Sequence, residues 1–223
     1  MNITFIGGGN MASALINGLL QQGYLAKQLH VVEINAESRE KIKDIFGVSA
    51  LADLESGVID TDVIVLSVKP QHLHDLTQQL SPFLKRQLII SIVAGIRVGD
   101  IARWLGGYLR IVRTMPNTPS SIQCGVTGLY AAASVSEEDR KIAESILTAV
   151  GLTLWVEDEE MLHAVTAISG SGPAYVFYFI ESLQKAAAAL GLSSEEAKQL
   201  SLQTFVGASK LASLSDKDIA ILR

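Results

Sequence analysis

The sequence predicts an α/β domain followed by an all-helical domain, and three observations support this prediction. Up to about residue 155, strand-like apolar runs alternate with helical segments, as in βαβ units on a parallel sheet. Several runs, such as residues 63–66 and 88–90, are apolar on both faces, which is typical of strands that helices cover on both sides. After Trp155 the strand signals stop. We therefore expect a first domain over residues 1–156 and a helical second domain over residues 157–223.

Regularly spaced elements are expected in the first domain. Strands are predicted at residues 2–6, 29–34, 63–67, 88–93 and 109–114. Helices fit the intervening segments 11–22, 37–46, 71–81 and 98–105. A further helix over residues 136–150 opens with Ser136 and three acidic residues, which form a favourable cap and first turn. Together these elements predict a central parallel sheet between helices.

The second domain should begin with a helix over residues 159–169. This helix is expected to bury Met161, Val165 and Ile168, which follow helical spacing. Pro173 suits the first turn of the next helix, which should run to about Leu190 with Gly191 as its C-terminal stop.

A last long helix is predicted from the capping box of Ser193 and Glu196 to about residue 213. The three helices of this domain carry apolar residues on more than one face, and one chain cannot bury all of these faces by itself. We therefore expect a dimerisation domain that forms a homodimer or a larger homo-oligomer. The alternative is that these helices pack only on the first domain.

Composition limits the classes of partner and chemistry. The 223 residues carry a net charge of −5 without a basic cluster, which argues against nucleic acid and anionic membrane as partners. No apolar stretch reaches the ~18 residues that a membrane span needs. The single cysteine, Cys124, allows no intrachain disulfide, and the four histidines lack metal-ligand spacing. We expect a cytoplasmic protein without a metal site.

A glycine-rich turn follows the first expected strand. Gly7 permits a tight turn, Gly9 lets the backbone approach a pyrophosphate, and Ala12 lets the helix pack closely on the strand. Backbone N–H groups and the positive end of the helix dipole would then face the phosphates. Such turns also occur without a ligand, but the position between a strand and a helix favours a Rossmann-like dinucleotide site.

Two charged residues end neighbouring strands near this turn. Glu33 lies where dinucleotide folds place an acid that binds the adenine ribose, and an acid there repels a 2′-phosphate. Lys69, between Val68 and Pro70, should lie at the carboxyl edge of the sheet and hold phosphate or ribose oxygens. The alternative for both is an ordinary solvated charge at a strand end. Arg39 remains a second cation within reach of a phosphate.

Three later segments complete the candidate site. Ala94 and Gly95 leave a strand at the same edge, and their small size suits a flat ring close to the backbone. Asn117, in a loop made rigid by two prolines, offers a donor and an acceptor. Ser171 and Gly172 precede a helix, so their backbone N–H groups are candidates for binding a carboxylate; a plain helix connection would look the same.

The motifs in order resemble the pyrroline-5-carboxylate reductase family. They are Phe5-Ile6-Gly7-Gly8-Gly9-Asn10-Met11-Ala12, Val68-Lys69-Pro70, Ala94-Gly95, Met115-Pro116-Asn117-Thr118-Pro119 and Ser169-Gly170-Ser171-Gly172-Pro173-Ala174-Tyr175. The resemblance covers essentially the whole chain. It implies that the chain reduces the cyclic imino acid 1-pyrroline-5-carboxylate to L-proline with NADPH or NADH, the last step of proline biosynthesis. It also implies a helical dimerisation domain with active sites at the subunit interface.

The resemblance carries site roles to particular positions. Cofactor binding is implied for residues of the glycine turn and of the two later strand ends: Gly8, Asn10, Met11, Val68, Lys69, Ala94 and Gly95. Glu33 stands where many relatives have a small or hydroxyl residue that accepts the 2′-phosphate, so strict use of NADPH is in doubt. Asp216 lies near the position of an acidic residue close to the substrate. No catalytic residue is identified, and no proton donor is assigned.

One family segment is absent from the sequence. The family has a Ser-Pro-Gly-Gly-Thr-Thr-like stretch after the last long helix, and this chain stops at Arg223 without it. Either the chain is truncated or its end was not ordered. A protein that ended here would be expected to bind cofactor better than it turns over the imine.

Two alternative functions remain open. A 3-hydroxyacid dehydrogenase of related architecture would need a lysine early in the helix that starts at Pro173, and residues 174–181 contain none. A catalytically impaired nucleotide-binding scaffold would fit the missing segment. For the reductase we expect direct hydride transfer to a protonated imine, which needs little acid catalysis because it is already an electrophile.

Overall fold

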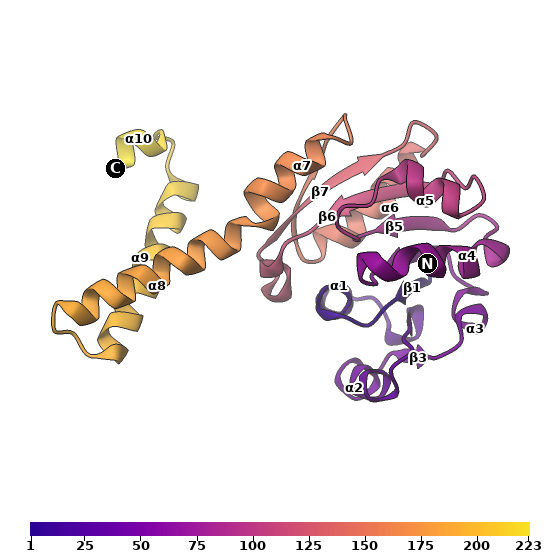
Figure 1. The fold of residues 1–223 in the computed structure, drawn as a ribbon, viewed down its shortest axis with the longest axis horizontal. Helices are drawn as coiled ribbons and strands as arrows, with labels where there is room; N and C mark the ends of the chain where they lie inside the picture. Colours follow the sequence, from indigo (N-terminus) through magenta and orange to yellow (C-terminus); the bar gives the residue numbers. More distant parts are fainter. The chain divides into compact units, whose positions relative to one another are not determined.

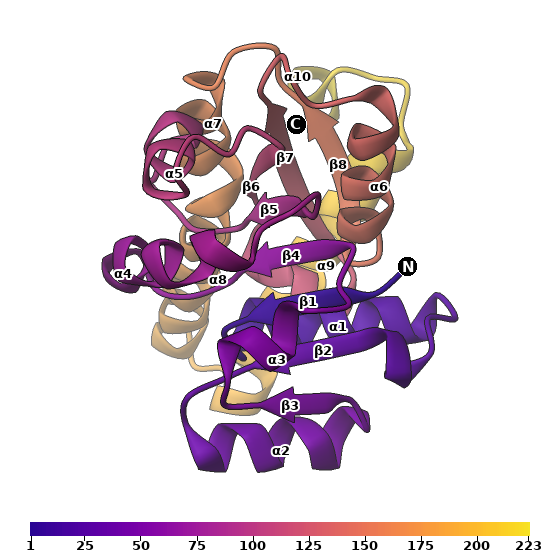
Figure 2. The ribbon, with the colours of Figure 1, turned by 90° about the vertical axis from the view of Figure 1, so that its right-hand side faces the viewer.

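Eight strands form one sheet in the computed structural model, which describes residues 1–223 (Figure 1). Their order across the sheet is β3-β2-β1-β4-β5-β6-β7-β8 (Figure 2). The strands are β1 Ile3–Ile6, β2 Leu29–Val32, β3 Ser49–Leu51, β4 Val63–Leu66, β5 Leu88–Ser91, β6 Ile111–Met115, β7 Gly125–Ala131 and β8 Gly151–Trp155. All neighbours pair in parallel except β6 and β7, which are antiparallel.

Helices cover both faces of this sheet. They are α1 Asn10–Gln21, α2 Ala36–Phe46, α3 Leu54–Val58, α4 Pro70–Leu80, α5 Val98–Trp104, α6 Glu137–Thr148 and α7 Met161–Val165. Short helices with other hydrogen-bond spacings are η1 Ala26–Gln28, η2 Ser81–Phe83, η3 Thr118–Ile122 and the π-helix η4 Thr166–Gly170.

Alternating strand residues build two separate cores. Ile3 and Phe5 pack with residues of α1, α2 and α6 on one face of the sheet. Ile6 and Leu66 pack with residues of α3, α4 and α5 on the other face. β1 and β4 are buried on both faces, and this explains why they are apolar at every position except Thr4, whose hydroxyl bonds to Gly57 and Thr61.

The five predicted strands are confirmed, but the sheet is larger than expected. β3, β7 and β8 were not anticipated, and β7 reverses direction relative to β6. β8 forms one edge of the sheet, and its Leu152 and Leu154 are 76% and 58% exposed. The parallel arrangement expected for the five predicted strands is confirmed, and the antiparallel pairing joins β6 to β7, a strand that was not predicted.

Helix α7 differs from the predicted helix over residues 159–169. The α-helix covers only Met161–Val165, and η4 continues it as a π-helix. Met161 and Ile168 are 53% and 79% exposed, whereas Leu162 is buried. Val165 is half-buried beside Gly128, so the expectation holds in part for this residue. It was wrong for Met161, in the first turn of α7, and for Ile168, which lies in the π-helix, where the wider turn changes the side-chain spacing.

Gly128 allows α7 to lie close to β7. A Cβ atom at Gly128 would come within 2.8 Å of Val165 Cγ1 and 3.2 Å of Leu162 Cδ2. Because of this packing, the contacts divide the chain into Met1–Gly170 and Ser171–Arg223. This division falls later than the boundary expected after residue 156.

The second unit contains a helical hairpin. α8 (Gly172–Ala189) and α9 (Ser194–Leu214) pack on each other, and the short α10 (Ile219–Leu222) follows. The predicted capping box is confirmed: Ser193 Oγ accepts from the Glu196 N–H, and the Glu196 carboxylate accepts from the Ser193 N–H. Only Ala197 and Ser201 are buried, so most apolar side chains of the hairpin are exposed. No helix of either unit combines the length and the apolar character needed to cross a membrane.

Candidate cofactor site

A cleft of about 650 Å³ opens at the carboxyl ends of β1, β2 and β4. The sheet order changes direction at β1, whose neighbours are β2 and β4, and open α/β sheets bind ligands at such a point. The lining comes from the ends of these strands, the residues after β3 and one face of α4: Ile6, Gly7, Gly8, Gly9, Val32, Glu33, Ile34, Ala52, Asp53, Leu54, Ser67, Val68, Lys69, His72, Asp75, Leu76 and Gln79.

The glycine turn is held in a conformation that only glycine adopts easily. Gly7 has a φ of +100°, and a Cβ atom there would lie 2.7 Å from the Ser67 carbonyl oxygen. The Gly7 N–H donates to the Val32 carbonyl at 2.8 Å. Ser67 Oγ donates to the carbonyls of Ile6 and Gly7. These contacts fix the turn against the ends of β2 and β4.

Gly9 leaves open space at the start of α1. No atom lies within 4 Å of a Cβ built on Gly9, and no side chain caps this helix. The first N–H groups of a helix need partners, and together with the helix dipole they favour an anion. The turn therefore has the geometry that a diphosphate requires.

The Glu33 carboxylate is fixed on the wall of the cleft. Oε2 accepts from the Gly8 N–H and Oε1 from the Asn35 N–H, both at 2.9 Å. Arg39 Nη1 donates to the carbonyls of Glu33 and Ile34 at 2.8 and 2.9 Å. The carboxylate thus occupies two backbone donors, and the guanidinium of Arg39 lies behind the same strand end.

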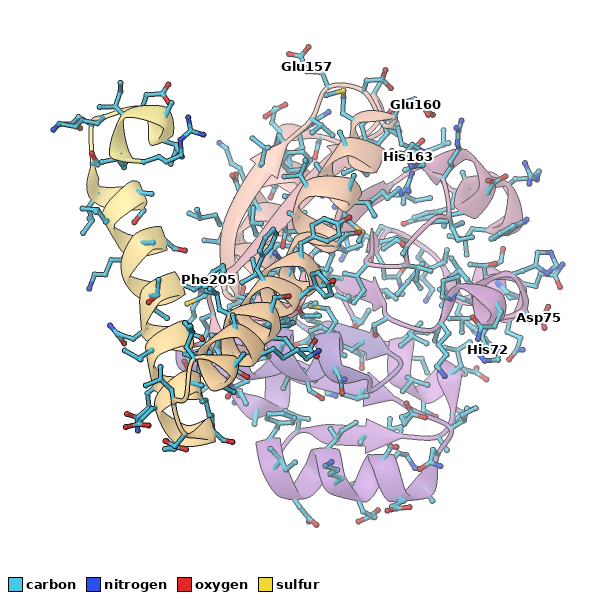
Figure 3. All side chains as sticks on the ribbon, turned by 60° about the vertical axis from the view of Figure 1, so that its left-hand side comes forward. His72, Asp75, Glu157, Glu160, His163 and Phe205 are labelled. Atoms are coloured by element: carbon cyan, nitrogen blue, oxygen red, sulfur yellow. The ribbon has the colours of Figure 1, made fainter.

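The cleft carries more acidic than basic side chains. Glu33, Asp53 and Asp75 line it, against Lys69 and the weak base His72. Hydrogen bonds from Ser56 to the Asp53 carboxylate lower the pKa of Asp53, so this group is ionised at neutral pH. His72 and Asp75 project from one side of α4 (Figure 3). This excess of negative charge disfavours the binding of a dianionic 2′-phosphate on the adenine ribose.

The remaining residues predicted for cofactor binding lie outside this cleft. Asn10 and Met11 line a neighbouring pocket of about 540 Å³ between α1, α2 and η3. Pro70 is the first residue of α4. Ala94 and Gly95 lie in the loop between β5 and α5, where Gly95 has a φ of +80°.

Asn117 makes its hydrogen bonds within the protein. Its Oδ1 accepts from the Val126 N–H at 2.9 Å, and its Nδ2 donates to the Ser169 carbonyl at 3.2 Å. Asn117 is buried and joins η3, β7 and η4. Beside it, the Ser169 hydroxyl oxygen is buried and has no hydrogen-bond partner.

The residues predicted for substrate binding belong to the second unit. Ser171 precedes α8 and does not cap it with its side chain, so the N–H groups of the first turn have no side-chain partner. Gly172 is the first residue of α8. Asp216 is exposed in the segment between α9 and α10.

Two groups of lining residues were missed at the sequence level. Asp53 and Leu54 follow β3, a strand of three residues that was not predicted. His72, Asp75, Leu76 and Gln79 share one face of α4. These residues are three or four positions apart in a helix that starts at the carboxyl edge of the sheet, so they share one helix face. That spacing could have identified them as lining residues.

Comparisons with known proteins agree along the whole chain. The family model described as NADP oxidoreductase coenzyme F420-dependent matches residues 2–95, and the model described as pyrroline-5-carboxylate reductase dimerisation matches residues 159–223. The pyrroline-5-carboxylate reductase of Pseudomonas aeruginosa is 46% identical over 222 residues, which cover 99% of this chain and 81% of that protein.

Solved structures show the same similarity. A pyrroline-5-carboxylate reductase from Coxiella burnetii has a TM-score of 0.94 and 42% identity, over 100% of this chain and 83% of that one. The Plasmodium falciparum pyrroline carboxylate reductase, solved with NADP bound, has a TM-score of 0.89 and 31% identity, over 100% of this chain and 82% of that one. By sequence and by fold, this chain belongs to the pyrroline-5-carboxylate reductase family.

Proposed function

We propose that this chain reduces 1-pyrroline-5-carboxylate to L-proline with NAD(P)H, the last step of proline biosynthesis. The observation that carries the proposal is the uncapped start of α1 beneath Gly9, at the point where the sheet order reverses. The relatives named above supply the reaction, and the cleft supplies the place for its coenzyme.

The residues of the first unit fit a dinucleotide. Gly7, Gly8 and Gly9, with Asn10 and Met11 at the start of α1, would hold the diphosphate, since the space at Gly9 admits it. Glu33 would bind the adenine ribose, and Val68, Lys69 and Pro70 would flank the other ribose. Ala94 and Gly95 would lie against the nicotinamide. Bound NAD(P)H supplies the hydride.

The substrate needs a site for its carboxylate. We assign this role to the backbone N–H groups at Ser171 and Gly172, which have no side-chain cap, and a supporting role to Asp216. Asn117 positions the η3 loop through its two hydrogen bonds. The protonated imine is already electrophilic, so the protein mainly orients the two reactants.

The alternative as a 3-hydroxyacid dehydrogenase gains no support from the helical unit. Lys185 is the only lysine of α8, and it is exposed and paired with Glu181. The family assignment favours the reductase over both alternatives.

Assembly and location extend the proposal. The exposed apolar side chains of α8 and α9 and the match to a dimerisation family support a homodimer, or a larger homo-oligomer, formed through the helical domain. That family match begins at residue 159, close to the domain boundary that we propose after residue 156. The single exposed thiol, Cys124, suits the cytoplasm.

The test is the oxidation of NADPH and NADH, followed at 340 nm with pyrroline-5-carboxylate as the second substrate. The matched variants are Gly9→Ala and Gly99→Ala, because neither position has an atom within 4 Å of the added Cβ. We expect Gly9→Ala to raise the Kd for NAD(P)H at least about tenfold, since the methyl group occupies the diphosphate's approach. Gly99→Ala should bind like the wild type.

Two results would contradict the proposal. A wild-type protein that oxidises neither coenzyme with this imine lacks the proposed activity. Equal coenzyme affinity in the wild type and in Gly9→Ala, with both proteins folded, would place the diphosphate elsewhere.

A further inference from the structure

One oxygen of Glu159 joins two distant parts of the first unit. Glu159 Oε1 accepts from the Val98 N–H and from Arg113 Nη1, each at 2.8 Å. Val98 is the first residue of α5, and the residue before it, Arg97, provides no side-chain cap. Glu159 therefore caps α5 from the segment that leads into α7.

This ion pair is withdrawn from water. The side chain of Arg113 is 6% exposed and that of Glu159 is 17% exposed. A buried pair is weak evidence of added stability, because removing both charges from water opposes their attraction. Separating the two partners would leave a buried charge unpaired, which is costly. The two side chains therefore stay together, and the segments that carry them stay in register. The pair thus sets the position of the segments more than their stability.

A second, exposed pair reinforces the same junction. Arg97 Nη2 lies 2.7 Å from Glu160 Oε1, and more than half of each side chain is exposed. Two successive acids at the start of α7 thus contact two successive residues at the start of α5. Glu160 Oε2 also lies 3.6 Å from His163 Nε2, and Figure 3 shows Glu157 apart from these two residues.

The joined segments border the proposed seat of the nicotinamide. The loop that contains Ala94 and Gly95 leads directly into Val98, the first residue of α5. From Glu159 the chain continues through α7 into the π-helix, where Asn117 binds the Ser169 carbonyl. π-Helical turns are frequent at functional sites, and the Ser169 hydroxyl is a buried group without a partner there.

We propose that Glu159 is a positioning residue for hydride transfer, which it serves by fixing the Ala94–Gly95 loop relative to α7 and the π-helix. This inference rests on the proposed reductase function. Reacting atoms must come within about 3–3.5 Å, and a misplacement of about 1 Å costs roughly a hundredfold in rate. Glu159 lines no part of the glycine-turn cleft, so binding of the adenosine half does not depend on it.

The experiment compares Glu159→Gln, Glu159→Ala and the control Glu157→Ala in the full chain. Glu157 is exposed on the same segment and forms no ion pair. Gln keeps the length and one acceptor for the Val98 N–H, whereas Ala removes both contacts and leaves Arg113 unpaired. If the Ala variant fails to fold, the Gln variant still decides the question.

We expect kcat to fall about tenfold in Glu159→Gln and about a hundredfold in Glu159→Ala. The Kd for NAD(P)H should stay within about twofold of the wild-type value. The kinetic isotope effect with coenzyme deuterated at the transferred position should increase, because hydride transfer becomes rate-limiting. A merely structural role would lower the thermal midpoint without this change in the isotope effect. Glu157→Ala should match the wild type in all respects.

Amide hydrogen exchange gives an independent measurement. In both Glu159 variants, exchange should accelerate in residues 95–98 and 166–170, and residues 7–16 should be unaffected. Unchanged exchange there, or wild-type kcat and isotope effect in a folded variant, would overturn the inference. If the wild type shows no turnover, the proposed function fails, and the exchange data still decide whether Glu159 holds the two segments together.

Discussion

Replacing Glu33 with serine should shift coenzyme preference toward NADPH. The Glu33 carboxylate is fixed by the N–H groups of Gly8 and Asn35, so it cannot easily turn away from a 2′-phosphate on the neighbouring ribose. The substitution removes this negative charge and releases both N–H donors. Arg39, which already contacts the Glu33 carbonyl, becomes a cation for the phosphate without a competing acid.

Coulomb's law gives the size of the effect. With only one of the two phosphate charges counted, charges about 5 Å apart repel by about 1.7 kcal/mol at an effective dielectric constant of about 40, between the values for water and for a protein surface. This energy corresponds to a factor of about 15 to 20 in affinity. The ratio of kcat/KM for NADPH to that for NADH should therefore rise at least about tenfold.

The assay measures initial rates with both coenzymes for four proteins. Glu33→Gln removes the charge at nearly constant size and should give a large part of the shift. Glu37→Ser is the matched control, because Glu37 is exposed in the first turn of α2 and does not line the cleft. A ratio that stays at the wild-type value in both Glu33 variants would refute the electrostatic argument.

Two further predictions concern stability and assembly. Hydrogen bonding to Arg110 lowers the pKa of the buried Asp139. The contact therefore stabilises the folded state fully at pH values above the unfolded pKa of about 3.9. This stabilisation is lost as the pH falls through the lower pKa of the folded state. The wild type should therefore exceed Asp139→Asn in urea unfolding midpoint at pH 7, and the difference should shrink below about pH 4; a constant difference would contradict this. Phe179→Asp places a charge among the exposed apolar residues of α8 and should convert the proposed dimer to a monomer in sedimentation velocity. Gln22→Asp on the first unit should not change the assembly, and a monomeric wild type at micromolar concentration would contradict the proposed interface.

The central strands could be predicted because strands that are buried on both faces consist mostly of apolar residues. β1, β4 and β5 carry apolar residues on both faces, and helices cover both faces. β3 has only three residues, with Ser49 exposed, so no pattern develops. β7 contains Gly125 and Gly128, which the packing of Ser120 and Val165 requires and which weaken the strand signal.

The candidate site shows the same division. The local motif at Gly7 and Gly9 was readable because each glycine has its own backbone requirement. The contacts of Glu159 with Val98 and Arg113 span 61 and 46 residues, and no local pattern indicates them. Asn117 was predicted to offer its donor and acceptor to a ligand, and no local pattern showed that both groups bond inside the fold.

The two edge strands of the sheet, β3 and β8, differ in how readily another molecule could pair with them. β3 is short and begins with an exposed serine, whereas β8 presents five residues without a charge or a proline, and two leucines face water. Unpaired backbone groups along such a margin are a template for strand addition by another molecule. Precipitation of concentrated protein should therefore start at β8, and a lysine in place of Leu152 is the natural modification for crystallisation or storage.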